Sequence, residues 1–154
     1  MKEEITICWL RRDLRLNDNA ALYHALKSSG KVLILFLFDK EILQRLEDKS
    51  DKRVAFIHER LTILEKEVQA YDSSLRVVFD FPVAAFEKLQ EEFDVKAIYS
   101  NRDYELSAMQ RDFTIEEFAT KNNIDFQTFK DQVIFEKDEV MKKLLKLFCK
   151  LLTM

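Results

Sequence analysis

The segment that most constrains the fold is Val32 to Phe38, which reads "VLILFLF" and is apolar at every position. A strand with one face in water alternates apolar and polar residues, whereas a strand of a parallel sheet covered on both faces does not. The segment therefore predicts a strand in the middle of a parallel sheet, with helices packed on both of its faces.

Four further segments have the composition of strands, and longer stretches of helical period separate them. They are Ile5–Leu10, Leu75–Phe81, Val95–Ser100 and Ile124–Phe129. This alternation is typical of repeated βαβ units. We therefore predict an α/β fold, a Rossmann-like doubly wound sheet of five parallel strands with helices on both faces.

Two sets of apolar residues recur at helical spacing and predict helix faces that belong to the core. Pro82 suits the first turn of the second of these helices. We predict that Asn17 or Asp18 caps the helix after the first strand and that Gly30 ends it. The two sets are Val54, Ile57, Leu61, Leu64 and Val68, and Ala85, Phe86, Leu89 and Phe93.

Composition excludes several classes of site. Gly30 is the only glycine, so neither a G-x-G-x-x-G fingerprint nor a Walker loop can be written. The 25 basic and 28 acidic residues give a net charge of −3, which is unlike a stand-alone nucleic-acid-binding protein. We therefore expect no direct DNA binding by these residues.

The two cysteines, Cys8 and Cys149, are far apart and have no neighbouring histidine, so neither a zinc site nor a disulfide framework is predicted. A reducing cytosol fits this usage, and we expect a cytoplasmic location. No apolar run approaches the roughly 20 residues needed to span a bilayer. The N-terminus has acids where a signal peptide has bases, so neither export nor membrane insertion is expected.

Polar clusters follow three of the predicted strands, at the strand ends where open parallel sheets bind ligands. The first cluster contains Arg11, Arg12, Asp13 and Arg15, the second is Asp39, and the third is "NRDYE", residues 101–105. If the first strand lies between the second and the fourth, the three clusters converge on one crevice. The alternative is that these loops are polar because they are solvated.

The clusters contain no recognisable catalytic set. No Ser/His/Asp arrangement is present, and neither His24 nor His58 lies beside a candidate nucleophile in the sequence. We assign no catalytic residue and no metal ligand, and interpret both histidines as surface or core-edge groups.

The stretch "WLRRDLRLNDNAAL", Trp9 to Leu22, resembles the opening of the DNA photolyase and cryptochrome family, a strand followed by an R-R-D-L-R-x-x-D-N loop. The resemblance continues through "LFLFDKEILQRL", "KRVAFIHERL", "YSNRDYE", the Arg-Asp pair at 111–112 and "FKDQVIFEKDEV". It covers residues 4 to about 143.

The resemblance implies that residues 1–135 form the N-terminal α/β domain of a deoxyribodipyrimidine photo-lyase, an enzyme that repairs ultraviolet-induced pyrimidine dimers with blue light. That domain carries a light-harvesting antenna pigment, which passes its excitation to FAD in a larger helical domain. FAD and DNA would be bound by the helical domain and not by residues 1–135. We therefore expect two partners, the pigment and the FAD-binding helical domain, and expect this chain alone to be inactive.

The resemblance also implies which pigment is bound. Members that use folate have an Asn-Glu pair after the Y-E dipeptide, where this chain has Ser107 and Ala108. An 8-hydroxy-5-deazaflavin or another flavin is therefore favoured over methenyltetrahydrofolate. The expected cofactor-binding residues are Phe36, Arg53, Asp103, Glu105, Arg11 and Asp39.

Each role has a physical rationale and an alternative. Phe36 can stack on a planar ring, Asp103 and Glu105 can accept hydrogen bonds, and Arg53 can bind an oxygen atom. Alternatively, Arg53 forms a solvent-exposed ion pair and Glu105 is a first-turn acid that favours the helix dipole. For the Arg11-Arg12-Asp13 loop we favour a structural or interdomain role.

Residues 136–154 end in "MKKLLKLFCKLLTM", a composition compatible with a short basic amphipathic helix. We interpret this tail as a truncation or frameshift before the helical domain, with a helix packed on the domain or weak membrane adsorption as alternatives. The competing functions are a cryptochrome-like photoreceptor, a nucleotide-binding regulatory module, and a fragment without a ligand that self-associates through exposed interdomain surface.

Overall fold

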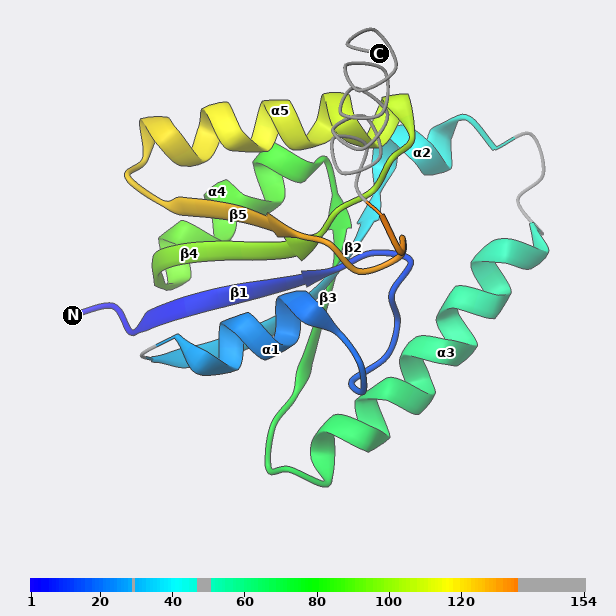
Figure 1. Cartoon of the computed structure of the whole chain (residues 1–154), viewed down its shortest axis with the longest axis horizontal. Coiled ribbons are helices and arrows are strands. Elements are labelled where there is room, and N and C mark those ends of the chain that lie inside the picture. The colour runs from blue at the N-terminus through cyan, green and yellow to red at the C-terminus, as the bar shows by residue number, and fades with distance from the viewer. Residues whose placement is uncertain (29, 47–50, 136–154) are drawn as a thin grey trace, which may run out of the picture.

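The structure is a computed structural model, and it describes residues 1–28, 30–46 and 51–135. Five parallel strands form one sheet in the order β3-β2-β1-β4-β5 (Figure 1). Their bounds are β1 Glu4–Leu10, β2 Lys31–Asp39, β3 Leu75–Asp80, β4 Asp94–Asn101 and β5 Asp125–Phe129. The predicted five-stranded parallel sheet is confirmed. The tail at 136–154 lies outside the described residues.

Helices cover both faces of the sheet, as predicted. Apolar residues of α4 and α5 pack with Ile5, Ile7 and Trp9 of β1, while α1 and α3 pack with Cys8 and Leu10 of the same strand. The helices are α1 Ala20–Lys27, α2 Lys40–Gln44, α3 Lys52–Gln69, α4 Pro82–Glu92 and α5 Leu106–Lys121. Because β1 alternates its side chains between two covered faces, it is buried along almost its whole length.

The middle position of the sheet belongs to β1, and the prediction that Val32 to Phe38 occupies it is wrong. This segment, within β2, lies between β1 and β3. A fully apolar pattern indicates that both faces of a strand are buried, and both faces of every internal strand of a doubly wound sheet are buried.

One residue of β1, Thr6, is polar and buried. Its hydroxyl accepts a hydrogen bond from the Ser28 hydroxyl at 3.2 Å.

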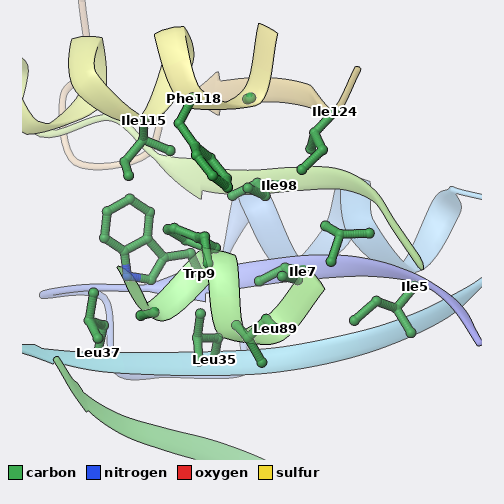
Figure 2. Close-up of a cluster of buried hydrophobic side chains, with 14 residues drawn as sticks. Ile5, Ile7, Trp9, Leu35, Leu37, Leu89, Ile98, Ile115, Phe118 and Ile124 are labelled. Atoms are coloured by element: carbon green, nitrogen blue, oxygen red, sulfur yellow. The ribbon is translucent and has the colours of Figure 1, made fainter. Parts of the chain in front are cut away.

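The larger core cluster lies between the sheet and the α4–α5 layer (Figure 2). In it the indole of Trp9 meets the ring of Phe86 edge to face, with the ring centroids 5.3 Å apart. Ile98 and Ile115 are fully buried beside them. Each such side chain contributes roughly 1.5–3 kcal/mol when it leaves water.

The predicted ends of α1 are corrected in detail. Its N-cap is Asn19, whose side chain accepts a hydrogen bond from the Leu22 amide, rather than Asn17 or Asp18. Asp18 has a φ of 51° and forms the turn before the cap. The C-cap is Ser28, and Gly30, with a φ of 139°, follows it. Pro82 begins α4, as predicted.

The apolar face predicted for residues 54–68 is only partly core. Leu61, Leu64 and Val68 are buried, whereas Val54 and Ile57 are half-buried. The N-terminal half of α3 extends past the end of the sheet (Figure 1). There Ile57 still packs on the edge of the core cluster, and Val54 and Ile57 both line a cavity.

A buried polar network holds the loop after β1. The Asp13 carboxylate accepts hydrogen bonds from the Arg11 amide at 2.8 Å, from Asn19 Nδ2 at 3.0 Å and from Asn101 Nδ2 at 2.6 Å. Asp13, Asn19 and Asn101 are all buried. A buried carboxylate is costly unless hydrogen bonds replace its water, so the three donors determine where the loop lies.

The same network satisfies the start of α1. Asn101 Oδ1 accepts from the Ala21 amide at 2.8 Å, and Asn19 Oδ1 accepts from the Leu22 amide at 3.0 Å. These are backbone donors that a helix leaves unpaired in its first turn. One set of side chains therefore joins the β1 loop, α1 and the end of β4.

We predict that Asn101→Ala lowers the free energy of unfolding by about 2–4 kcal/mol, because it removes a donor to the Asp13 carboxylate and leaves the Ala21 amide unpaired. Urea unfolding followed by circular dichroism measures this change. The control is Asn17→Ala, an exposed position where a change within about 0.5 kcal/mol is expected. Equal losses for the two variants would contradict the role of the network.

Candidate functional site

A cavity of about 480 Å³ opens beside the carboxyl ends of β1 and β2. All six residues expected from the sequence to bind a cofactor line it, namely Arg11, Phe36, Asp39, Arg53, Asp103 and Glu105. Members of all three strand-end clusters line the cavity because β1 lies between β2 and β4, which was the condition for convergence, whereas Asp13, Arg15 and Asn101 do not. Their role in binding stays a prediction.

The walls of the cavity are largely apolar. Phe36 lies near the end of β2 and is 6% exposed, and its ring meets Phe38 edge to face at 4.9 Å. Leu43 after β2 and Val54 and Ile57 of α3 add aliphatic surface. The sequence interpretation placed Val54 and Ile57 in the core. Their position beyond the sheet end could not be read from helical spacing alone.

A carboxylate corner forms where β4 leads into α5. Arg12 contacts both acids, with Nη2 2.5 Å from Glu105 Oε2 and Nε 3.4 Å from Asp103 Oδ2. The hydrogen bond to Glu105 is the largest of the interactions that raise the pKa of Arg12. Asp103 is buried and Glu105 is exposed. Arg12, which was not among the residues expected to bind the cofactor, therefore holds two residues that were, Asp103 and Glu105.

Glu105 is the N-cap of α5, but its side chain does not cap the helix. Its carboxylate reaches Arg12 instead, while the Glu105 amide donates to Asp103 Oδ1 at 3.2 Å. The local turn therefore directs two carboxylates toward the cavity.

Arg53 lines the cavity from the first turn of α3 and is paired with Asp51. The two side chains meet at 2.6 Å, and Asp51 also accepts a hydrogen bond from the Arg53 amide at 2.8 Å. The side-chain hydrogen bond from Arg53, followed by the backbone one, lowers the pKa of Asp51 to about 2. The Arg53 side chain is 77% exposed, so its ion pair is the solvent-exposed one that the sequence left as an alternative.

Two arginines flank Trp9 on the inner side of the cavity. Arg11 donates through both terminal nitrogens to Asp112, one of them at 3.0 Å, and its guanidinium carbon lies 4.2 Å from the indole centroid. The guanidinium carbon of Arg111 lies 5.3 Å from the same centroid. Arg111 forms an ion pair with Asp39, with Nη1 3.9 Å from Oδ2. Burial, and then the charge of Arg11, lowers the pKa of Arg111.

The Nε atoms of Arg11 and Arg111 are buried and have no hydrogen-bond partner among the described residues. Both residues line the cavity. A polar ligand atom can satisfy a donor of this kind at little cost, because the donor has already lost its water. Arg11 thus has the structural role that the sequence favoured, through Asp112, and also lies in the cavity wall.

Neither histidine lines this cavity, and both are exposed, which agrees with their interpretation as surface or core-edge groups. His24 stacks on Phe129 of β5 at 4.2 Å between ring centroids, and His58 is exposed on α3. Within residues 1–28, 30–46 and 51–135, no group of His, Cys, Asp and Glu is arranged to hold a metal ion. In the same part of the chain, no helix is long and apolar enough to cross a bilayer.

These features suit the binding of a small molecule. The cavity combines an aromatic and aliphatic wall with hydrogen-bond acceptors at Asp103 and Glu105 and donors at Arg11, Arg53 and Arg111. Such a set matches a planar heterocycle with polar atoms on its edge.

Comparison with known proteins gives one consistent family. The family model described as DNA photolyase matches residues 6–150. A deoxyribodipyrimidine photo-lyase of Alkalihalophilus pseudofirmus is 29% identical over 146 residues, which cover 92% of this chain and 30% of that protein. The chain thus spans 27–30% of the length of this protein and of two further deoxyribodipyrimidine photo-lyases that it matches.

Solved structures agree on the fold. A class III photolyase from Agrobacterium tumefaciens superposes with a TM-score of 0.77 at 22% identity, covering 88% of this chain and 27% of that one. An archaeal photolyase from Sulfolobus tokodaii, whose two FAD molecules are described as implying a novel light-harvesting cofactor, gives a TM-score of 0.75 at 28% identity, covering 87% of this chain and 31% of that one. By its family model and the shared fold, the chain belongs to the DNA photolyase family, of which it represents the N-terminal α/β domain.

Proposed function

We propose that this domain binds an antenna pigment and passes its excitation by resonance transfer to FAD held elsewhere in the full-length photolyase. One observation carries the proposal: the residues expected to bind the pigment lie around a single cavity of about 480 Å³. Ligand pockets in proteins have volumes of roughly 300–1,000 Å³ and bury most of the surface of a drug-sized ligand, so the volume of this cavity is in the usual range.

The residues fit a flavin-type ring. The Phe36 ring offers an aromatic surface, and Asp103 and Glu105 offer acceptors for ring or side-chain donors. The orphaned Nε atoms of Arg11 and Arg111 match acceptor atoms of the ligand. We therefore favour an 8-hydroxy-5-deazaflavin or another flavin over methenyltetrahydrofolate, because Ser107 and Ala108 line the cavity where folate-binding members have Asn and Glu.

The remaining partner in this proposal is the FAD-binding helical domain. Exposed apolar side chains line one face of α5, where Leu106, Met109 and Phe113 are 72%, 55% and 62% exposed. Surface of this kind is expected at an interdomain contact. In the chain alone the same surface can promote self-association.

We predict saturable binding of one pigment in parallel titrations with 8-hydroxy-5-deazaflavin, FMN and methenyltetrahydrofolate. Trp9 is the only tryptophan of the chain and lines the cavity, so quenching of its fluorescence reports occupancy at the site itself. Glu105→Gln keeps an acceptor oxygen but removes the negative charge, so it should weaken binding about tenfold, the difference between a hydrogen bond to a charged acceptor and one to a neutral acceptor.

The matched control is Glu117→Gln, an exposed acid on α5 that does not line the cavity. It should leave the affinity unchanged. ATP is included in the series because saturable binding of ATP alone would favour a nucleotide-binding regulatory module. Binding of no pigment, or equal losses for the two variants, would overturn the proposed site.

We predict that Arg53→Gln raises the pKa of Asp51 from about 2 toward its ordinary value of 3.8, because the largest stabilising contact of the carboxylate is removed. Since the folded pKa is the lower one, the stability that this pair contributes is complete above about pH 4 and is lost as the pH falls toward 2. A carbon-13 NMR titration of the Asp51 carboxyl group measures the shift.

Arg45→Gln is the control for that titration, since Arg45 pairs with Glu41 and should not affect Asp51. A pigment that recruits Arg53 should raise the pKa of Asp51 in the same direction as Arg53→Gln. An Asp51 pKa that is equal in wild type and Arg53→Gln would show that the pair does not form in solution.

We predict that the isolated chain, even supplied with FAD, does not cleave pyrimidine dimers in light. The reason is that the part assigned to FAD and DNA lies in the two thirds of the curated relatives that this chain does not match. A dimer-cleavage assay under blue light, with a full-length photolyase as the positive control, measures this. Light-dependent cleavage by the chain alone would show the prediction to be wrong.

A further inference from the structure

Trp9 lies where its indole can quench an excited antenna pigment. It lines the cavity from the end of β1 and is 2% exposed. In Figure 2 its indole lies at the end of the core cluster near Ile115 and Leu37, away from Ile5. A ligand that fills the cavity would therefore lie close to an indole held rigidly by the core.

An indole next to an excited flavin-type ring can donate an electron to it. In that step the indole is oxidised, the excited pigment is reduced, and the return of the electron releases the energy as heat. No bond forms or breaks. The excitation is lost before it can be transferred, so an antenna site needs either distance from tryptophan or a means of making tryptophan a poor donor.

The surroundings of Trp9 supply such a means. Two guanidinium groups contact its ring, at 4.2 Å for Arg11 and 5.3 Å for Arg111. A cation over a neutral indole is attracted to the negative face of the ring. If the indole loses an electron, the same cation faces a positive charge, and the attraction becomes repulsion that burial strengthens.

Arg111 is the less neutralised of the two cations. Both terminal nitrogens of Arg11 bind the Asp112 carboxylate, which offsets part of its charge. The ion pair between Arg111 and Asp39 is 3.9 Å long, which is beyond hydrogen-bonding distance. Arginine keeps its proton in proteins, so the charge beside Trp9 is permanent.

Charges on the pigment side act in the same direction. The buried carboxylates of Asp39 and Asp103 line the cavity that the pigment would fill. Negative charge close to the pigment disfavours its reduction, while positive charge close to Trp9 disfavours oxidation of the indole. Because Asp39 is paired with Arg111 and Asp103 with Arg12, the two acids are partly neutralised, and the contacts of the two guanidinium groups with Trp9 are the main effect.

We propose that Arg111, assisted by Arg11, protects the excited pigment from quenching by Trp9. This inference rests on the proposed function, since it requires a pigment in the cavity. It gives the Trp9-Arg11-Arg111 group a photophysical role, in addition to the packing of Trp9 on Phe86.

The test measures the fluorescence lifetime of the pigment that binds in the titration, at saturation, in the full chain. The variants are Arg111→Gln, the charge-conserving Arg111→Lys, Trp9→Phe, and Trp9→Phe combined with Arg111→Gln. We expect Arg111→Gln to shorten the lifetime by about twofold or more, because the charge opposing oxidation of Trp9 is gone. Arg111→Lys should keep most of the wild-type lifetime.

The double variant separates this role from a structural one. If Trp9 is the quencher, Trp9→Phe with Arg111→Gln has the long lifetime of Trp9→Phe alone. A short lifetime that persists without Trp9 would overturn the inference, as would an unchanged lifetime in Arg111→Gln. Absence of pigment binding in the wild type would overturn the proposed function and this inference together, whereas binding with an unchanged lifetime overturns only the latter.

Discussion

The buried Asp13 carboxylate is the constraint on which the arrangement of the site depends. Its donors come from the backbone of its own loop, from Asn19 at the start of α1 and from Asn101 at the end of β4. A carboxylate removed from water is tolerated only when such donors converge on it. The network therefore joins the carboxyl ends of β1 and β4, and the turn after β4 brings Asp103 and Glu105 to the cavity on the β1–β2 side.

The ion pairs around the cavity are of two kinds, buried pairs that stabilise the fold and solvent-exposed pairs that a ligand can replace. Arg11 and Asp112 are 6% and 16% exposed, so breaking this pair would leave a buried charge. The Arg12–Glu105 and Arg53–Asp51 pairs include side chains that are 57% and 77% exposed, and such pairs contribute roughly 0–1 kcal/mol. A ligand can displace one partner of such an exposed pair at low cost. This suits a binding site whose acidic and basic side chains are already paired with one another.

Much of the fold followed from local pattern. Strand segments and the helical face of α4 appeared at the expected residues because period and apolarity are local properties. The capping residue of α1 did not, since the choice among Asn17, Asp18 and Asn19 depends on which side chain also reaches Asp13. Val54 and Ile57 were assigned to the core because their spacing matches that of Leu61 and Leu64, although both are only half-buried and line the cavity.

The sequence by itself determined the α/β class, the parallel sheet and, through its resemblance to photolyases, which residues surround the cavity. The tertiary structure alone decided that β1 is central, that Arg12 holds Asp103 and Glu105, and that Arg11 and Arg111 both contact Trp9. The period of apolar residues along the sequence indicates which residues are buried. The order of strands and the pairing of charges depend on contacts between residues up to about a hundred positions apart, such as Arg11 and Asp112, which no local pattern encodes.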